Sequence, residues 1–274
     1  TKENLLTTVT VLQEFRPGID FKDITYTFLR DFEVHLKEKG NSVNTIAKHL
    51  RQLRTLVSEA INQGYIPSDA YPFRKFKIKQ EKGRKEFLTP DELRKLENLQ
   101  VSDKRLRHVL DAFLFCCYTG LRYSDFCQLT PENIIRVNGK RWLYFKSVKT
   151  DVEIRLPLHL LFEGKALAVL ERYDIVTDFA KIGLNSEANK YLAQLATLAR
   201  IRKHITYHTA RHTCVTLLVH QGVPITTVQK LLGHTSVRTT EVYSEVLSNT
   251  IIRDLKAVKR KKKTPDFSRV VECG

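Results

Sequence analysis

The sequence predicts a mainly α-helical protein with a small antiparallel sheet, divided into two domains. Up to Gly64, apolar residues recur at intervals of three and four, the spacing of helices with one buried face. This periodicity fails between Pro67 and Glu86, in a basic stretch whose composition is typical of a linker. The dipeptide Asn138-Gly139 then separates two short β-type runs, which indicates a tight hairpin turn.

Helices are expected throughout the first domain. Thr25 is a suitable N-cap for a helix that runs to Lys39 and stops at Gly40. Ser42 can cap the next helix, in which the apolar spacing continues to Gly64. Its apolar residues are Ile46, Leu50, Leu53, Val57 and Ile61. Its opposite, polar face carries Lys48, His49, Arg51 and Arg54. Such a face is typical of a solvated surface, and in so basic a chain it also suits a surface that faces DNA.

A strongly basic segment separates the two domains. Residues 74–86 contain seven basic residues against Glu81 and Glu86. The seven are Arg74, Lys75, Lys77, Lys79, Lys82, Arg84 and Lys85. Such a segment can serve solubility or follow a phosphate backbone. The predicted divisions are a helical domain over 1–73, a linker over 74–86, a second domain over 87–258 and a basic tail over 259–274.

The second domain is expected to open with a helix and to continue through a hairpin. Thr89-Pro90-Asp91-Glu92 has the form of a capping box with proline at the first helical position. An apolar helix follows from about Leu106 to Tyr118 and ends at Gly120, after which Ser124 can cap another helix. Strands are expected over Ile134–Val137, Trp142–Phe145 and Glu153–Leu156. Helices return beyond Pro157, with apolar periodicity at Leu192, Leu195, Leu198, Val215 and Leu218.

The composition indicates a basic, globular protein. The 274 residues contain 46 Lys and Arg against 30 Asp and Glu, which gives a net charge of +16. This excess favours a polyanionic partner, whether nucleic acid, ribosome or anionic membrane surface.

The sequence also bears on where the protein is found. A transmembrane run and a secretory signal are lacking. The five cysteines have neither disulfide nor metal-ligand spacing, so a reducing cytoplasm is expected. The absence of methionine and the initial Thr1 predict that the sequence begins inside a longer protein.

Four short segments contain residues that suit phosphate binding or chemistry on a phosphate. In TGLRYSD, Arg122 directly follows a helix that stops at glycine. In HTARH, His208 and Arg211 lie on one face of a predicted helix and could hold one phosphate together. In LLGHTS, His234 lies at a helix break, and in TEVYS, Tyr243 lies on a predicted short helix.

Each of these residues has an ordinary explanation when it is taken alone. Arg122 could be a surface residue, Tyr243 a packing aromatic, and Lys149 an exposed residue of a turn between two strands. Together, TGLRYSD, a KT pair in a β-hairpin, HTARHT, LLGHTS and the final tyrosine resemble the tyrosine recombinases of the phage-integrase family, over about residues 20–257. The segments TGLRYSDF and ITYHTARHT are especially similar to integrases of Bacteroides-type conjugative transposons.

The resemblance implies a fold and a set of phosphate contacts. The fold would be a helical, SAM-like core-binding domain followed by an α+β catalytic domain, and the two would clamp duplex DNA. Tyr243 would attack a phosphodiester and form a 3′-phosphotyrosyl link with release of a 5′-hydroxyl. Arg122 and Arg211 would hold the nonbridging phosphate oxygens, and His234 would donate a further hydrogen bond to the phosphate.

The resemblance also implies how protons move and that no cofactor is needed. Lys149, on a mobile turn, would protonate the leaving oxygen, and His208 would act as a general base or position the tyrosine. Asp125 would orient groups of the site, unless it is a simple acid at a helix start. Neither metal nor ATP is expected, because Asp111, Asp125 and Asp151 lie on unlike elements and do not form the carboxylate cluster of a metal-dependent nuclease.

The partners implied are double-stranded DNA and further copies of the chain. A homotetramer would act on two duplexes to integrate and excise a mobile element, with the segment 246–257 docked on a neighbouring copy. The residues expected to contact DNA are Lys48, Arg51, Arg54, Arg74, Lys75, Lys77 and Lys79. A DNA-bending accessory protein and an excision factor are known partners of such a role, but the sequence does not show whether they are required here. Association with the nucleoid is also expected. The arm-site domain that such integrases usually carry is not seen, so either the sequence is a fragment or arm-site binding is absent.

Two other classes of protein share part of this pattern. A type IB topoisomerase uses similar tyrosine chemistry, but it relaxes supercoils without pairing two specific sites. A helix-turn-helix regulator could be formed by Ile225–Gly233 followed by Thr235–Tyr243, and it would never become attached to DNA covalently. The regulator would leave Arg122, Lys149 and His208 without a role.

Overall fold

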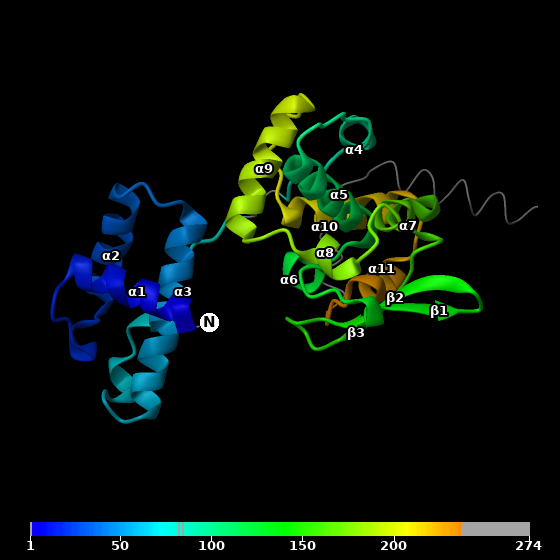
Figure 1. Cartoon of the computed structure of the whole chain (residues 1–274). Coiled ribbons are helices and arrows are strands. Elements are labelled where there is room, and N and C mark those ends of the chain that lie inside the picture. The colour runs from blue at the N-terminus through cyan, green and yellow to red at the C-terminus, as the bar shows by residue number, and fades with distance from the viewer. Residues whose placement is uncertain (1, 82, 84, 237–274) are drawn as a thin grey trace, which may run out of the picture. The chain divides into compact units, whose positions relative to one another are not determined.

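The computed structural model describes residues 2–81, 83 and 85–236. The chain divides into two compact units between Arg84 and Lys85 (Figure 1). The predicted nucleophile Tyr243, the segment 246–257 and the basic tail 259–274 lie outside the described residues.

The first unit is helical over the residues that the structure describes. Its α-helices are α1 (Lys2–Phe15), α2 (Tyr26–Glu38) and α3 (Val43–Asn62). Its 3-10 helices are η1 (Phe21–Asp23), η2 (Ser68–Ala70) and η3 (Pro72–Arg74). Both predicted caps are confirmed. Thr25 Oγ1 accepts a hydrogen bond from Phe28 N at 3.2 Å, and Ser42 Oγ accepts one from Thr45 N at the same distance.

The beginning of the basic segment packs on the first unit. Phe76 is buried in the apolar core of that unit, and Ile78 packs against this core. Further along, Asn44 on α3 accepts a hydrogen bond through its Oδ1 from Glu81 N at 3.1 Å. Residues 74–81, which the sequence assigns to a linker, therefore lie against the helices of the first unit.

His49 does not lie on the polar face of α3, so that prediction is wrong. Its side chain is buried, and its Nδ1 lies 2.9 Å from Oγ1 of the fully buried Thr8 on α1. The Thr8 hydroxyl also bonds to Gln52 on α3. Helix α1 covers this side of α3, and the periodicity of α3 alone does not reveal that partner.

The second unit combines helices with one sheet. Its α-helices are α4 (Pro90–Glu97), α5 (Lys104–Thr119), α6 (Tyr123–Phe126), α7 (Lys165–Leu170), α8 (Val176–Ala180), α9 (Asn185–Leu198), α10 (Tyr207–His220) and α11 (Ile225–Leu232). Its 3-10 helices are η4 (Pro131–Asn133) and η5 (Leu161–Gly164). Its strands are β1 (Ile134–Val137), β2 (Lys140–Lys146) and β3 (Glu153–Pro157). The predicted capping box before α4 is confirmed, because Thr89 and Glu92 exchange backbone-to-side-chain hydrogen bonds of 2.8 and 3.2 Å.

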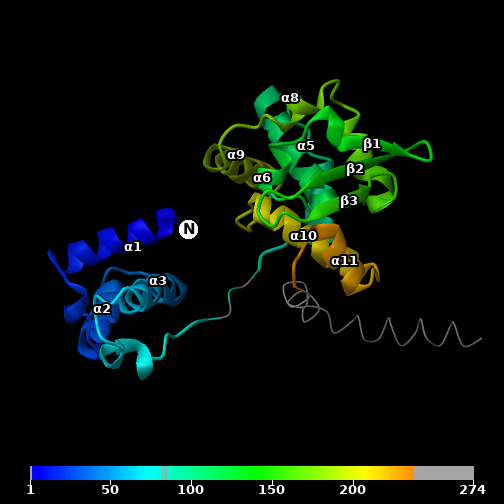
Figure 2. The same ribbon diagram turned by 90° about the horizontal axis from the view of Figure 1, so that it is seen from below.

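The three strands form an antiparallel sheet in the order β1-β2-β3. The predicted hairpin turn is confirmed: Asn138 and Gly139 have φ angles of 50° and 74°, the left-handed pair of a type I′ turn. Phe145 of β2 pairs with Ile154 of β3, and both side chains are buried. Helix α11 packs beside β3, which brings the end of this helix close to the turn between β2 and β3 (Figure 2).

Helix α5 forms the centre of the second core. Every residue from 109 to 119 is buried, because α7, α9 and α10 pack around this helix (Figure 1). Leu192 and Leu195 of α9 are fully buried, but Leu198, predicted on the same stripe, is 55% exposed. Helix α9 ends at Leu198, and Ile201 enters the core in its place.

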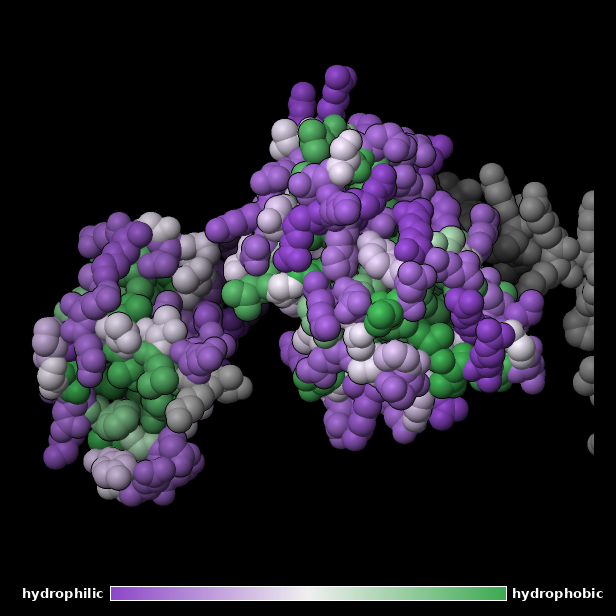
Figure 3. Space-filling model, in the orientation of Figure 1, coloured by the Kyte–Doolittle hydropathy of each residue, from purple (hydrophilic) through white to green (hydrophobic). Residues whose placement is uncertain are grey.

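The predicted fold class, mainly helical with a small antiparallel sheet, is confirmed. Hydrophilic residues predominate on the face of the molecule that Figure 3 shows, and apolar residues appear there as separate patches. Among the described helices, none combines the length and apolar character that crossing a membrane requires.

Gly233 supplies a test of the packing between α11 and the sheet. It ends α11 with a φ of 60°, and an added Cβ would lie 2.7 Å from Cδ1 of the buried Ile154. Backbone strain and overpacking together should lower the free energy of unfolding of Gly233→Ala by about 2–4 kcal/mol, measured by urea denaturation. Gly139→Ala is the control, because its φ is 74° but no atom lies within 4 Å of an added Cβ. An equal decrease in the free energy of unfolding of the two variants would contradict the close packing of Gly233 on Ile154.

Candidate active site

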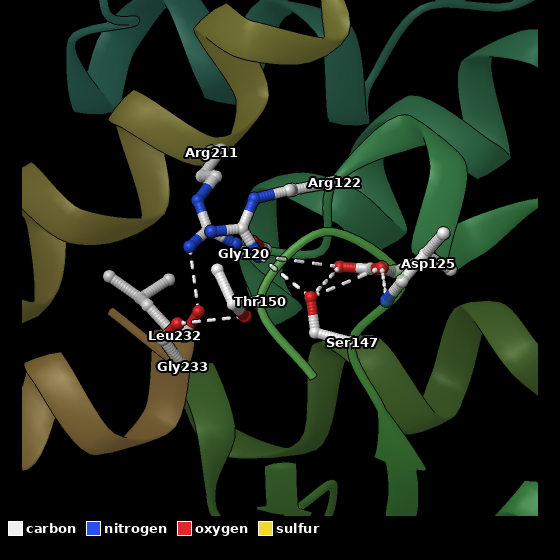
Figure 4. Close-up of polar contacts among 9 residues, drawn as sticks. Gly120, Arg122, Asp125, Ser147, Thr150, Arg211, Leu232 and Gly233 are labelled. Carbon is white, nitrogen blue, oxygen red and sulfur yellow. Dashed lines mark hydrogen bonds and ion pairs between the residues drawn. The ribbon is translucent and has the colours of Figure 1, made fainter. Parts of the chain in front are cut away.

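The candidate site forms where the C-terminal ends of α5 and α11 meet. Arg211, on α10, is 6% exposed and donates hydrogen bonds to the carbonyl oxygens of Gly120 at 2.6 Å and Leu232 at 2.7 Å. Carbonyl groups at the end of a helix lack an intrahelical donor and carry the negative end of its dipole. Arg211 therefore joins the ends of two helices and is itself fixed in place by them (Figure 4).

Arg122 approaches the same place from the start of α6. Its Nη1 donates a hydrogen bond to Ser147 Oγ at 3.0 Å and lies 3.6 Å from Oδ2 of Asp125. The guanidinium groups of Arg122 and Arg211 point toward each other in Figure 4. Two such planar groups, each with several N–H donors, suit the oxygen atoms of one phosphate group.

Asp125 connects α6 to the chain that follows β2. Its carboxylate is buried and accepts hydrogen bonds from Ser147 Oγ at 3.2 and 3.4 Å and from Val148 N at 3.0 Å. It also forms the ion pair with Arg122. Of the two explanations that the sequence left open for Asp125, this geometry supports the orienting one.

Helix α6 begins earlier than the sequence predicts. Ser124 is the second residue of this helix and not its cap, so that prediction is wrong. The carbonyl of Arg122 accepts the first helical hydrogen bond, from Phe126 N at 2.9 Å. The early start places Asp125 in the first turn of the helix, from which it reaches the chain after β2.

Lys149 is exposed on the turn between β2 and β3. The turn is closed by a hydrogen bond from Asp151 N to Ser147 O of 2.8 Å. It is attached to α6 through Val148 N and to the end of α11 through Thr150, whose Oγ1 donates to Gly233 O at 3.3 Å. The lysine that the sequence places on a mobile turn is thus carried by a turn with bonds to two neighbouring elements.

His208 lies one helical turn before Arg211, as the sequence predicts. Partial removal of its ring from water, together with the charges of Arg211, Lys149 and Arg122, lowers its pKa. Three cations from three different elements therefore act on this one ring. A neutral imidazole is the form that can accept a proton.

His234 follows the glycine that ends α11. Its backbone N donates to Gln229 O at 3.1 Å, and Gln229 Nε2 donates to His234 O at 3.0 Å. Burial lowers the pKa of His234 to about 4, with further lowering by the charges of Arg211 and Arg122. Since the ring is neutral at neutral pH, it can donate one hydrogen bond without adding charge.

Ser147, Thr150 and His212 also bond to or adjoin the groups of the site, although none of them was predicted as a site residue. The ring of His212 lies 5.9 Å from that of His208, and burial lowers its pKa to about 4, followed by the charge of Lys85. The i, i+4 spacing from His208 could have indicated His212. Ser147 had no such signal, because its partners are distant in the sequence. Thr150 belongs to the KT pair, but its partner Gly233 is equally distant in the sequence.

Asp111, Asp125 and Asp151, the three aspartates considered from the sequence, each bond to different partners in the described part of the chain. Within the described part of the chain, no group of three or more His, Cys, Asp and Glu could hold a metal ion. Asp111 pairs with Arg172 at 2.7 Å, and Asp151 pairs with Lys146 at 2.8 Å. The site is therefore a set of cationic and neutral donors from α6, α10, α11 and the turn after β2, which suits a phosphodiester as ligand.

The residues predicted to contact DNA lie on the first unit. Those that are exposed are Lys48, Arg54, Arg74, Lys75, Lys77 and Lys79. Arg51 is half-buried, and its Nη1 donates to Gln80 Oε1 at 2.9 Å, which holds this part of the basic segment against α3. Tyr243 lies outside the described residues, so the geometry of the site does not include it.

The chain belongs to the phage integrase family. The model of that family matches residues 86–249, and the model of the phage integrase SAM-like domain matches residues 1–78. Membership implies the activity of the family, which cleaves and rejoins DNA strands.

Relatives of known name support the same family. Tyrosine recombinase XerC of Bacillus licheniformis is 29% identical over 248 residues, covering 82% of this chain and 78% of that protein. XerC of Oceanobacillus iheyensis is 30% identical over 244 residues, covering 82% and 77%.

Solved structures share the fold. A lambda integrase (residues 75–356) dimer bound to a COC′ core site has a TM-score of 0.72 at 21% identity, covering 88% of this chain and 86% of that chain. The Tn1549 transposon integrase with circular intermediate DNA has a TM-score of 0.69 at 19% identity, covering 90% of each.

Two histidines whose pKa is lowered to about 4 predict a pH dependence of stability. His212 and His234 have pKa values of about 4 in the folded protein, against 6.5 when unperturbed. Between these pH values the unfolded chain binds protons that the folded chain does not, so the melting temperature should fall as the pH is lowered from about 6.5 to about 4. We expect a smaller fall in His212→Gln than in the wild type, measured by thermal denaturation. His220→Gln, at an exposed position of the same helix, is the control, and an equal fall in both variants would contradict the assignment.

Proposed function

We propose that this protein is a site-specific recombinase that integrates and excises a mobile element through a 3′-phosphotyrosyl intermediate on Tyr243. The observation that carries the proposal is the convergence of Arg122 and Arg211 with the turn of Lys149, held by contacts that join α5, α6, α10 and α11. Phosphoryl transfer depends mainly on such fixed positive groups around the phosphate.

Arg122, Arg211 and His234 contact the nonbridging oxygens in this mechanism. When the tyrosine oxygen attacks phosphorus, negative charge accumulates on those oxygens in the transition state. The two guanidinium groups are positioned before the reaction, because Ser147 holds one and helix-end carbonyls hold the other. Prepositioned donors stabilise the transition state without reorganising during the step.

Lys149 and His208 take part in the proton transfers of this mechanism. Lys149 donates a proton to the 5′ oxygen as the bond from this oxygen to phosphorus breaks. His208, whose pKa is lowered, accepts the proton of the tyrosine hydroxyl or aligns that hydroxyl. The phosphotyrosyl bond retains the energy of the phosphodiester, so religation proceeds without ATP or metal.

The motifs TGLRYSDF and ITYHTARHT support an integrase that is encoded by a mobile element, similar to those of Bacteroides-type conjugative transposons. The shared fold of the Tn1549 transposon integrase is compatible with this role. The relatives named XerC are the main support for the competing assignment, a Xer-type recombinase. Four copies on two duplexes would suit the reaction, as in the lambda integrase tetramer bound to a Holliday junction.

Covalent trapping tests the chemistry directly. A nicked suicide substrate that contains the flanking DNA of the source element, incubated with EDTA, should give a protein–DNA band that resists denaturation. The band should be lost in Tyr243→Phe, because the nucleophilic oxygen is absent. A band that requires a divalent metal, or that persists in the Phe variant, would overturn the mechanism. Relaxation of supercoiled DNA without recombinant product would assign the chain to a topoisomerase.

The basic face of α3 should contribute to DNA affinity through phosphate contacts. Lys48→Ala should weaken DNA binding and make the slope of log K against log salt concentration less steep by about 0.9, the value for one phosphate contact. Lys37→Ala is the control, since Lys37 is exposed on α2 of the same unit. Equal slopes in wild type and Lys48→Ala, measured by titration of duplex DNA at several salt concentrations, would remove Lys48 from the interface.

A further inference from the structure

Thr150 attaches the turn that carries Lys149 to the end of helix α11. Its Oγ1 donates a hydrogen bond to Gly233 O at 3.3 Å. This carbonyl ends a helix, so no donor of the helix itself is available to it. The neighbouring carbonyl of Leu232 accepts from Arg211 at 2.7 Å, so consecutive carbonyl groups of α11 bind the turn and the arginine.

The acceptor of Thr150 is itself fixed. Gly233 packs so closely on β3 that an added Cβ would lie 2.7 Å from Cδ1 of Ile154. The other side of the turn is held by Asp125, which accepts from Val148 N at 3.0 Å. Lys149 thus lies between two attachments, at Val148 and at Thr150, one on each side of it in the sequence.

We infer that Thr150 is a positioning residue for Lys149 in DNA cleavage. The lysine side chain has many rotamers, and a general acid must come within about 3 Å of the atom it protonates. A turn held on both sides restricts the lysine to a smaller range of positions. This inference rests on the proposed function, in which Lys149 is the general acid.

Proton transfer from Lys149 to the leaving oxygen predicts that a chemically altered DNA substrate restores cleavage by variants in which this transfer is impaired. The tyrosine oxygen bonds to phosphorus, the bond from phosphorus to the 5′ oxygen breaks, and the proton of Lys149 passes to that oxygen. If sulfur replaces the bridging 5′ oxygen, the leaving thiolate is stable without a proton, so the general acid and its positioning become unnecessary.

The experiment compares cleavage rates of Thr150→Val and Thr150→Ser on both substrates. Valine keeps the shape but removes the hydroxyl donor, whereas serine keeps the donor. On ordinary DNA we expect valine to slow cleavage about tenfold, part of the ~10²–10⁴-fold that general acid–base catalysis contributes, and serine to cleave near the wild-type rate. On the sulfur substrate, valine and wild type should cleave at equal rates. Thr150→Ala gives a second variant that lacks the hydroxyl donor, and thermal denaturation checks that each variant is folded.

Lys149→Ala separates failure of this inference from failure of the proposed function. Rescue of Lys149→Ala by sulfur without rescue of Thr150→Val would show that Thr150 acts on stability or on another group, which overturns the inference. No rescue of Lys149→Ala would show that Lys149 is not the general acid, and the proposed mechanism would fail with it. Wild-type cleavage of ordinary DNA by Thr150→Val and Thr150→Ala would also overturn the inference.

Discussion

The second unit depends on one buried arginine that binds the ends of two helices. Arg211 donates to Gly120 O and Leu232 O, the places where α5 and α11 stop. Moving a guanidinium group out of water is unfavourable unless its donors find partners, and helix-end carbonyls are strong acceptors in need of donors. The same contacts that satisfy these groups bring Arg122, just after α5, and His234, just after α11, to one place. The hydrogen bonds of Arg211 therefore both stabilise the ends of the two helices and bring the groups of the candidate site together.

The electrostatics of the site follow from this arrangement. Partial burial lowers the pKa values of His208 and His234, and the charges of Arg211 and Arg122 lower them further. Asp125 is buried beside Arg122, and its carboxylate accepts hydrogen bonds from Ser147 and Val148, at the turn after β2. The histidines are neutral at neutral pH, whereas the two guanidinium groups keep their positive charge, because arginine does not lose its proton in proteins. An anionic phosphate would find hydrogen-bond donors of both kinds, charged and neutral.

Local signals in the sequence predicted most elements, while contacts between distant segments were not predictable. The caps at Thr25 and Thr89 and the Asn138-Gly139 turn depend on neighbouring residues, and each was predicted. His49 was misplaced because its partner lies on α1, and Ser147 and Thr150 were missed because theirs lie on α6 and α11. The motifs brought the arginines and histidines to attention, but the bonds that hold them are long-range. Hydrophobic periodicity and residue propensities in a single sequence do not show which residues distant in the sequence bond to each other.

The division into two units, each with its own apolar core, has an evolutionary consequence. The described groups of the candidate site all come from the second unit, whereas the predicted DNA-contacting side chains of α3 and the basic segment belong to the first. Substitutions on the surface of α3 leave the bonds of Arg211 and Asp125 untouched. Under the proposed function, the DNA contacts of the first unit can therefore change through such substitutions while the bonds that hold the candidate site in the second unit are preserved.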